Sequence, residues 1–422
     1  MSRRDVPGKS LIVPMWLKPQ DMNAYVKVGM VGCGGITTNH IRGAKLLQDA
    51  GVCNLEFTAC YDVVPDKAKN KAAEIRTILG YEPRTYGSLD EMLRREEEIE
   101  AVDICSDHLS HHVLAVQSLQ SGRHVIIEKP LGITMKAAHL IVDTAKRNNR
   151  VLAVAENYRR MPGNRAINWS IRTGKIGKPR VMMWVESAYN LHFWGWRHDR
   201  KKAGGGWILD GGVHTADLML YDLGPVDEVY AVTRTLEPLK FQDWPSMLEG
   251  VPTDVEDLSF AVLRFSSGVT GLWAWTSAAP GDSINHRIIH GDRGSVSWNK
   301  GLTQQGQGNL GQFTMTHQEL IRQMLGEISE QEKQAFFPGG VGARADPWNF
   351  DVSMAIELWD FADSIARGRK PEVDGELGVA AEAIPISIYE SATLGEPVKV
   401  KDVELGTVDE YQHPLNKAAE LE

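Results

Sequence analysis

Three ionisable residues of this sequence have the chemistry needed to move a proton beside a reacting carbon. Lys129 directly follows His124 to Glu128, a largely apolar run with the composition of a buried strand. An ammonium group at the end of such a strand can stabilise the charge of a developing alkoxide. Asp210 and His214 lie four residues apart, so they would share one face of a helix. Histidine titrates near neutrality and can accept the proton of a carbinol, with Asp210 orienting either His214 or Lys129.

Each of these residues also has a purely structural interpretation. Lys129 and Glu128 could form an ordinary ion pair at a strand end, which is common on protein surfaces. Asp210 and His214 could do no more than stabilise the helix that carries them. The chemical interpretation therefore depends on whether other parts of the sequence bring a reactive group to the same place.

A glycine-rich turn near the start of the chain has the pattern of a phosphate-binding loop. The apolar run Val26 to Val31 leads directly into Gly32, and Gly34 and Gly35 follow before a helical pattern begins near Asn39. Gly32 permits the tight turn, Gly34 lets the backbone approach a pyrophosphate, and the helix N-terminus offers free N–H groups to the anion. A glycine-rich match alone can be a structural turn, so the flanking strand and helix carry this prediction.

The end of the second predicted strand indicates which dinucleotide the turn would bind. Leu55 to Tyr61 is an apolar run that ends at Asp62. A carboxylate in this position can accept hydrogen bonds from the ribose hydroxyls of an adenine dinucleotide. Because the same charge repels a 2'-phosphate, the sequence predicts NAD as the cofactor and disfavours NADP.

A parallel sheet would bring these residues to one edge. From residue 25 to residue 156, apolar runs alternate with helical patterns, which is typical of a doubly wound α/β domain. The ligand crevice of such a sheet lies at the carboxyl ends of its strands, where Gly32, Asp62 and Lys129 would meet. The strands expected here are Val26 to Val31, Leu55 to Tyr61, Val102 to Cys105, His124 to Glu128 and Val151 to Ala155.

The sequence after residue 156 has a different pattern. Residues 300 to 312 are rich in Gly, Gln and Asn and predict a loop. Before them, longer strand patterns are joined by tight turns, which predicts hairpins of an antiparallel sheet. These hairpins run from Leu258 to Phe265 into Val269 to Thr276, and from His286 to His290 into Ser295 to Trp298. The second domain is therefore expected to be α+β.

Composition and charge exclude several classes of function. With 422 residues, 42% hydrophobic and 24% charged, the chain has the composition of an ordinary soluble protein of two domains. No apolar run approaches the roughly 18 residues of a membrane span, and a formal charge of -9 disfavours nucleic acid as a partner. The four cysteines lack the paired spacing of a zinc site, so no metal is predicted. We expect reduced thiols in a cytoplasmic protein with an N-terminal arm.

Taken together, the motifs resemble the glucose-fructose oxidoreductase / inositol dehydrogenase / MocA (Gfo/Idh/MocA) family over residues 25 to 400. The most specific part is Glu-Lys-Pro at a strand end, followed by three glycines and then by Asp and His four residues apart. One departure is that Asp107 and His108 stand where the family usually shows Pro and Asn beside the cofactor. The segments that carry the resemblance are the turn at Gly32, Cys105 to His111, Gly122 to Pro130, Trp196-Arg197 and Gly204 to Asp217.

The resemblance implies a division of the chain. It places a Rossmann domain at residues 25–156, between an N-terminal arm, 1–24, and a substrate-binding and oligomerisation domain, 157–400. A C-terminal tail covers 401–422. The second domain is expected to contain a large, open, mainly antiparallel sheet that makes homodimer or homotetramer contacts.

The resemblance also implies that Lys129, Asp210 and His214 form the catalytic group. With the residues argued above, it gives the predicted cofactor-binding set as Gly32, Gly34, Gly35, Ile36, Asp62, Ser106, His108, His111, Glu128, Lys129 and Asn157. The residues expected to face the substrate, by resemblance or as partners of a sugar ring, are Lys129, Tyr158, Arg159, Tyr189, His192, Trp194, Trp196, Arg197, Asp210 and His214.

Three functions stay open at this point. The favoured one is an NAD-dependent oxidoreductase that moves a hydride between nicotinamide and a secondary carbinol of a sugar, glycoside or cyclitol. The second is an NAD-dependent glycosidase or lyase that works by transient oxidation and elimination. The third is a non-catalytic regulator that senses a sugar or NAD. Lys129, Asp210 and His214 count against the third, because a sensor has no need of a proton acceptor beside the hydride position.

Overall fold

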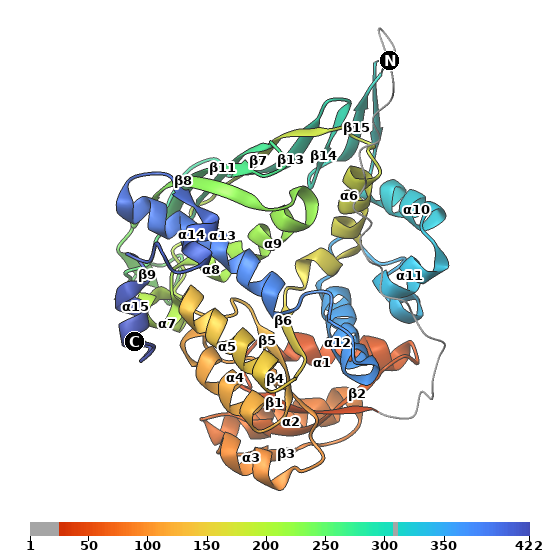
Figure 1. Ribbon diagram of the computed structural model, residues 1–422, viewed down its shortest axis with the longest axis vertical. Coiled ribbons are helices and arrows are strands. Elements are labelled where there is room, and N and C mark those ends of the chain that lie inside the picture. Colours follow the sequence, from red (N-terminus) through yellow and green to blue (C-terminus); the bar gives the residue numbers. More distant parts are fainter. Residues whose placement is uncertain (1–24, 307–310) are drawn as a thin grey trace.

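Six parallel strands form the first sheet of the computed structural model, which describes residues 25–306 and 311–422 (Figure 1). Their order is β3-β2-β1-β4-β5-β6, so the direction of winding reverses between β1 and β4. Ligands of doubly wound sheets bind in the crevice at that reversal. The predicted N-terminal arm, 1–24, lies outside the described residues. The strands are β1 (Val26–Val31), β2 (Leu55–Tyr61), β3 (Arg84–Tyr86), β4 (Ala101–Ile104), β5 (His124–Glu128) and β6 (Leu152–Ala155).

The predicted parallel sheet is confirmed, and its five predicted strands agree with the structure to within one residue at each end. The sixth, β3, was not predicted. It is an edge strand of three residues, none of which is buried, so its sequence carries no apolar run that would reveal it.

Helices pack against this sheet, and one of them comes from far along the chain. The helix α12 (Phe350–Arg367) packs against α1, and its residues Ala355, Leu358 and Phe361 belong to the same buried cluster as the residues of β1 and β2. The nucleotide-binding half is therefore completed by residues about two hundred positions beyond its last strand. The helices of the first half are α1 (Thr37–Asp49), α2 (Pro65–Leu79), α3 (Leu89–Arg95), α4 (His111–Gln120) and α5 (Met135–Arg147).

Nine strands form the second sheet, in the order β16-β15-β14-β13-β7-β12-β11-β8-β17. Only β7 and β12 pair in parallel within it, and the other neighbours are antiparallel, so the predicted mainly antiparallel sheet is confirmed. Its strands are β7 (Pro179–Ser187), β8 (Val226–Arg234), β11 (Leu258–Phe265), β12 (Thr270–Thr276), β13 (Ile284–Gly291), β14 (Gly294–Ser297), β15 (Gly301–Gln305), β16 (Gln312–Met315) and β17 (Val398–Lys399). A separate pair comprises β9 (Leu239–Phe241) and β10 (Gly250–Pro252).

The loop predicted for residues 300 to 312 is wrong for its first half. Residues Gly301–Gln305 form β15, which pairs with β14 and β16 near one end of the sheet. The backbone hydrogen bonds of these neighbours hold the segment extended although its Gly and Gln content is unusual for a strand.

Short and long helices fill the space between the two sheets. One of them, α13 (Gly375–Leu394), packs against α5 and β6 of the first half and against α9 and β8 of the second. The remaining α-helices are α6 (Pro162–Arg172), α7 (Arg200–Ala203), α8 (Trp207–Asp210), α9 (Gly212–Leu223), α10 (His317–Glu327), α11 (Glu330–Phe336), α14 (Val400–Glu404) and α15 (His413–Ala418). Four 3-10 helices are η1 (His108–Ser110), η2 (Tyr158–Arg160), η3 (Gly195–His198) and η4 (Pro338–Gly340).

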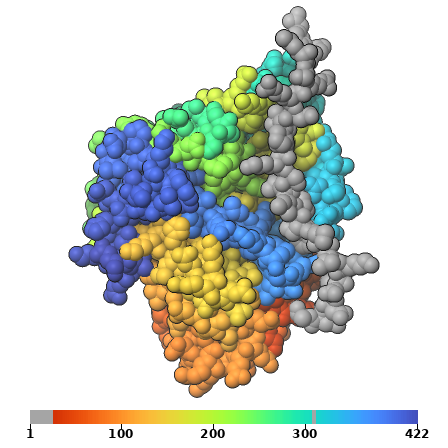
Figure 2. Space-filling view, viewed as in Figure 1, coloured from red at the N-terminus to blue at the C-terminus, as the bar shows by residue number. Residues whose placement is uncertain are grey.

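The segment 401–422 packs onto the first half of the molecule. The backbone N–H of Met135 donates to the Gln412 side chain at 2.7 Å, and the Thr134 hydroxyl donates to the Asn416 side chain at 2.7 Å. Figure 2 shows the C-terminal residues, in blue, lying against both the yellow and the green parts of the chain. Across the described residues, no helix is both long enough and apolar enough to cross a membrane.

The contact between α1 and α12 depends on a glycine. A Cβ atom at Gly43 would lie 2.8 Å from the backbone nitrogen of Ala355, so α12 would have to move. We expect Gly43→Ala to lower the free energy of unfolding by about 1–3 kcal/mol through overpacking. Gly326→Ala in α10 is the matched control, since a Cβ there meets nothing within 4 Å, and it should be neutral or stabilising by about 0.5–1 kcal/mol. Urea unfolding of both variants would measure the difference, and equal shifts would contradict this account.

Candidate active site

The glycine-rich turn has the shape that a pyrophosphate requires. Gly32 has a φ of +86°, and a Cβ there would lie 2.6 Å from the carbonyl oxygen of Cys105, so no larger residue fits. Above Gly34 and Gly35 the space is open, because a Cβ at either position meets nothing within 4 Å. The N-cap residue of α1, Ile36, has no side-chain hydrogen bond to the first turn. The N–H groups at this helix end therefore remain suited to an anion.

Asp62 is fixed at the end of β2 by two backbone groups. Its Oδ2 accepts from the N–H of Cys33 at 2.8 Å, and its Oδ1 accepts from the N–H of Val64 at 2.8 Å. Each carboxylate oxygen keeps a further lone pair for a ribose hydroxyl. The turn and this carboxylate thus fit an adenine dinucleotide such as NAD, which supplies a hydride acceptor when bound.

Lys129 meets Asp210 across the junction of the two halves. The Lys129 ammonium donates to the carbonyl oxygen of Asp210 at 2.6 Å and to its Oδ1 at 3.0 Å. Burial opposes the charge of Lys129, but the carboxylates of Asp210 and Glu128 outweigh it and raise the pKa of Lys129. Burial also opposes the charge of Asp210, and the Lys129 ammonium outweighs it and holds the pKa of Asp210 well below its usual range. At neutral pH both groups are therefore charged.

Other predicted residues gather around the same carboxylate. Arg197 donates from Nε to Oδ2 of Asp210 at 3.0 Å, and Nε2 of His108 lies 3.3 Å from Oδ1. The Trp196 ring meets the His108 ring edge-on, with centroids 4.6 Å apart. His108 thus contacts Asp210, and Ser106 lies beside the backbone of Gly32. Cofactor binding by both residues stays a prediction.

His214 has a different partner from the one the sequence suggested. Its Nδ1 lies 2.5 Å from Oε2 of Glu156, and its ring stacks on Tyr158 at 4.0 Å with an angle of 5°. Burial, followed by the nearby Lys129 charge, lowers the pKa of His214 to about 3, so the ring is neutral at physiological pH. A neutral imidazole next to a charged ammonium is the combination that carbinol oxidation needs.

The expectation that Asp210 could orient His214 is therefore corrected. The helical segment is interrupted at Gly211, where α8 ends and α9 begins, and Asp210 turns its carboxylate to Lys129. Sequence reasoning missed Glu156. A signal was present, because Glu156 is an acidic residue directly after the buried strand β6, as Asp62 is after β2.

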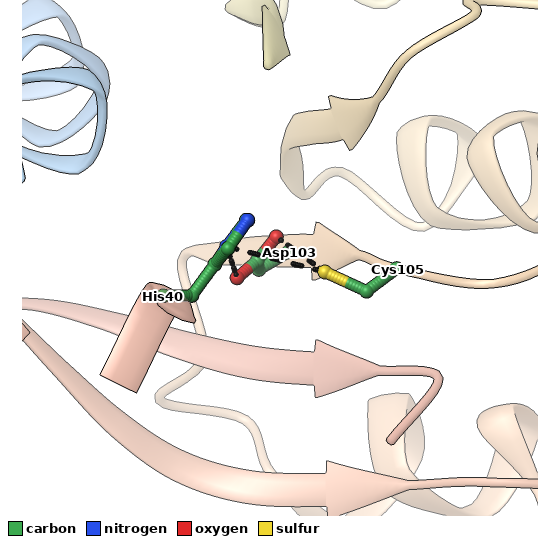
Figure 3. A group of neighbouring side chains, drawn as sticks. All are labelled: His40, Asp103 and Cys105. Atoms are coloured by element: carbon green, nitrogen blue, oxygen red, sulfur yellow. Dashed lines mark hydrogen bonds and ion pairs between the residues drawn. The ribbon is translucent and has the colours of Figure 1, made fainter. Parts of the chain in front are cut away.

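The buried imidazole of His40 holds the carboxylate of Glu128 in place. His40 on α1 points one ring nitrogen at Oε1 of Glu128, 3.1 Å away, and the other at Oδ2 of Asp103, 2.7 Å away. Cys105 donates from its thiol to Oδ1 of Asp103 at 3.3 Å, and Figure 3 shows His40, Asp103 and Cys105 clustered beside β4. Burial opposes a charge on His40, but Asp103 outweighs it and raises the pKa of His40 well above its ordinary value.

The cluster is best described as an imidazolium between two carboxylates. Its residues include types that bind metals and lie close enough together to do so, but both ring nitrogens of His40 already face a carboxylate. Glu128 in turn accepts from the backbone N–H of Lys129 at 3.2 Å. Glu128 thus helps to fix the backbone of Lys129, and its expected contact with the cofactor stays a prediction.

Three predicted ligand contacts are enclosed by protein. His111 is completely buried and donates to the carbonyl oxygen of Pro130 at 2.8 Å. Arg159, 5% exposed, donates from Nε to Asp217 at 2.8 Å, so its guanidinium is committed to an internal ion pair. Asn157, 1% exposed, donates to the hydroxyl of Ser353 at 2.8 Å. Their contacts with cofactor or substrate stay predictions, and among the described residues Nε2 of His111 and Oδ1 of Asn157 have no hydrogen-bond partner.

The aromatic residues at positions 189 to 194 form ring pairs of their own. His192 meets Trp194 edge-on at 4.7 Å, and Tyr189 meets Trp244 at 5.5 Å. Among the described residues, the ring contacts of Tyr189, His192 and Trp194 are thus made with neighbouring aromatic side chains. Their contact with the substrate stays a prediction.

Comparison with known proteins shows the family to which the chain belongs. A family model described as "Oxidoreductase family, NAD-binding Rossmann fold" matches residues 26–156, and one described as "GFO/IDH/MocA C-terminal domain" matches residues 165–297. The protein is thus an oxidoreductase with an NAD-binding Rossmann domain, as predicted. The chain belongs to the Gfo/Idh/MocA family, which confirms the resemblance noted in its sequence.

Named relatives share much of the chain. It is 27% identical over 379 residues to the 1,5-anhydro-D-fructose reductase of Ensifer adhaerens, a match that covers 88% of this chain and 98% of the relative. It is 30% identical over 258 residues to the levoglucosan dehydrogenase of Pseudarthrobacter phenanthrenivorans, covering 56% of this chain and 64% of the relative. A solved levoglucosan dehydrogenase, in complex with NADH and levoglucosan, superposes with a TM-score of 0.73 at 24% identity and covers 89% of this chain and 99% of that one. The structural match shows the shared fold.

The carboxylate of Asp62 should decide between the two nicotinamide dinucleotides. Asp62→Asn removes the charge but keeps the side-chain shape, so NADH should bind about tenfold more weakly through loss of hydrogen bonds to the ribose. NADPH should lose less affinity or gain some, because the repulsion of its 2'-phosphate disappears. Fluorescence titration with both cofactors measures this change, and Asp66→Asn in the first turn of α2 is the control. Equal losses for the two cofactors would show that Asp62 only supports the turn.

Proposed function

We propose that the chain transfers a hydride between NAD and a secondary carbinol of a sugar, glycoside or cyclitol, with Lys129, Asp210 and His214 in proton transfer. One observation carries this proposal. The Lys129 side chain, 14% exposed, and the neutral His214 ring, 6% exposed, lie near the carboxyl end of β5, and the Lys129 charge helps to lower the pKa of His214. This is where a doubly wound sheet presents its ligand to the second domain.

Each residue has a distinct part in the proposed reaction. His214 accepts the proton of the substrate hydroxyl, and Lys129 donates a hydrogen bond to the same oxygen as its negative charge develops. Asp210 holds the Lys129 ammonium in place through the contact at 3.0 Å. In the opposite direction the same groups return the proton to a carbonyl oxygen.

The substrate class is supported by the relatives and by the side chains around Asp210. Named relatives act on levoglucosan and 1,5-anhydro-D-fructose. Trp196 offers an aromatic face of the kind that stacks on sugar rings, and Arg197, with a side chain 40% exposed, offers donors for hydroxyl groups. Tyr158 and the aromatic group at Tyr189, His192 and Trp194 are proposed as further ring contacts.

A screen of carbohydrates tests the function. Levoglucosan and myo-inositol would be offered with NAD, and 1,5-anhydro-D-fructose with NADH, while NADH fluorescence is followed. At least one probe should change NADH in proportion to product. Glycoside cleavage without accumulating NADH, with solvent deuterium entering the sugar, would replace the proposal by the elimination reaction. Tight NAD binding without turnover of any probe would favour the sensing function.

Lys129→Ala should separate catalysis from cofactor binding. Loss of the ammonium removes the charge that stabilises the alkoxide, so kcat should fall by about a hundredfold to ten-thousandfold. NADH binding, measured by fluorescence, should persist. Lys146→Ala is the control, because that side chain is 58% exposed and pairs with Glu376 instead. If binding and turnover fall together, Lys129 is a cofactor anchor.

We propose that the second sheet also forms the contact surface of a homodimer or homotetramer. In one cross-strand row, Val262 lies between Tyr230 and Leu272, and Leu272 pairs in turn with Met183. The four side chains are 39–46% exposed, so the row is an apolar strip open to solvent. Figure 1 shows the helices gathered on one side of this sheet. Such strips are typical of protein–protein contacts.

A charge placed in this strip should dissociate the assembly. Val262→Glu would put a carboxylate among apolar neighbours, which costs several kcal/mol if the face is buried between copies. Sedimentation velocity should then show a monomer where the parent chain shows an oligomer. Val113→Glu on α4 is the control, since Val113 is 56% exposed and lies in the other half of the chain. An unchanged oligomer in Val262→Glu would contradict the proposed surface.

A cytoplasmic location is proposed with the same function. The four cysteines are all free, and three of them are buried. Thiols without disulfides are typical of proteins from reducing compartments. The negative formal charge of -9 supports a small-molecule substrate without a nucleic-acid partner.

A further inference from the structure

We propose that Glu156, and not Asp210, is the positioning residue of His214. Its carboxylate holds the Nδ1 proton of the imidazole and thereby leaves Nε2 as the atom that accepts the proton of the substrate hydroxyl. The inference rests on the proposed oxidoreductase function of the same site and adds a residue to it.

The contact between the two side chains is short and enclosed. Glu156 follows β6 and is 1% exposed, while His214 on α9 is 6% exposed. Their Oε2 and Nδ1 atoms lie 2.5 Å apart. The Tyr158 ring, stacked at 4.0 Å, keeps the imidazole in one plane. The first half of the chain therefore orients a ring that belongs to the second half.

Asp210, the carboxylate that the sequence suggested as a partner of His214, is already engaged. Asp210 accepts from Lys129 and Arg197 and lies beside His108. The carboxylate of Glu156 has no such competition, because in the described part of the chain its Oε1 is buried without a hydrogen-bond partner. The hydrogen bond that His214 donates is thus what stabilises a charged Glu156 carboxylate.

The proton count of the pair decides which ring nitrogen is free. Burial raises the pKa of Glu156 to about 8, against the opposing charges of Lys129 and Arg159. Below this pH the Glu156 carboxyl donates to Nδ1, so the neutral ring carries its own proton on Nε2 and cannot accept another. Above it, the carboxylate accepts from the Nδ1–H, and Nε2 presents a lone pair.

The surrounding charges come from several elements. Those that act on the pair are Glu128 and Lys129 at the end of β5, Arg159 and Arg160 in η2, Asp210 in α8, Asp217 in α9 and Glu382 in α13. The two cations of η2 are paired to other carboxylates, Arg159 to Asp217 and Arg160 to Glu357 and Asp360. The group that titrates in the pair is therefore Glu156.

The proposed step balances without a further reactant. The hydroxyl proton passes to Nε2 of His214, the carbinol carbon loses a hydride to the oxidised nicotinamide, and the C–O bond becomes a carbonyl. The imidazolium that results is stabilised by the Glu156 carboxylate. Oxidation should therefore rise with pH through the pKa of Glu156, by about tenfold per pH unit below it, and reduction should fall above it.

Nitrogen NMR of the full chain, with isotope-labelled histidine and no substrate, tests the proton count directly. His214→Gln identifies the signal. In the parent chain, the proton of the neutral His214 ring should move from Nε2 to Nδ1 as the pH rises from about 6 to about 10. The nitrogen signals report this change, and its midpoint should equal the pKa of Glu156. In Glu156→Gln this change should vanish. A His214 signal that keeps one tautomer throughout in the parent chain would overturn the proposal, even if Glu156→Gln fails to fold.

Glu357→Gln is the matched control. Glu357 is also buried, and burial likewise raises its pKa to about 8, but it pairs with Arg160 and not with His214. This variant should keep the NMR midpoint of His214. If it abolishes the midpoint as Glu156→Gln does, the titrating group is not Glu156 and the proposal fails.

Kinetics give the second readout. With levoglucosan as the probe, kcat/KM of oxidation in Glu156→Gln should fall by about a hundredfold and lose its rise with pH, while Glu156→Asp restores part of both. An unchanged pH profile in Glu156→Gln would overturn the proposal. If the parent chain turns over no probe at all, the proposed function fails, and the NMR result still decides the role of Glu156.

Discussion

The ion pair between Lys129 and Asp210 is the contact on which the arrangement of the site depends. Lys129 belongs to the first half of the chain and Asp210 to the second, and each is buried enough that its charge would be unfavourable without a partner. Removing either partner would leave the other with one fewer neighbour of opposite charge, since Arg197 still faces Asp210 and Glu128 still lies beside Lys129. The ion pair therefore favours the position of the two sheets that brings this ammonium and this carboxylate together.

The pair is the centre of a line of alternating charges. From the middle of β4 to the segment after β7, each charged group lies next to a group of opposite sign. The line comprises Asp103, His40, Glu128, Lys129, Asp210 and Arg197. Alternation makes the burial of the enclosed members of the line tolerable, because each has a neighbour of opposite sign that replaces the lost water, while Arg197, 40% exposed, ends the line at the surface. His214 stands beside this line with its own partner, Glu156, and so stays neutral among charges.

The positions of residues that directly follow an apolar strand could be predicted from the sequence. The glycine turn, Asp62 and Lys129 each follow an apolar strand directly, and the sheet places all such residues at one edge. Glu156 also follows a strand directly, so its place at that edge could be predicted. Its pairing with His214 could not, because periodicity shows which residues share a helix face but not which distant side chain meets them. The strand β15 was mistaken for a loop for a similar reason. Its extended form comes from the hydrogen bonds of neighbouring strands, to which its Gly and Gln residues contribute no recognisable pattern.

The position of α12 has a consequence for synthesis of the chain. Ala355, Leu358 and Phe361 fill part of the core around β1 and β2, yet they are made after eight of the nine strands of the second sheet. The nucleotide-binding half therefore emerges from the ribosome with apolar surface uncovered, and it must wait for most of the chain before its core is complete. During that interval the exposed apolar surface favours aggregation, and a dinucleotide that binds early can stabilise only the part that has already folded.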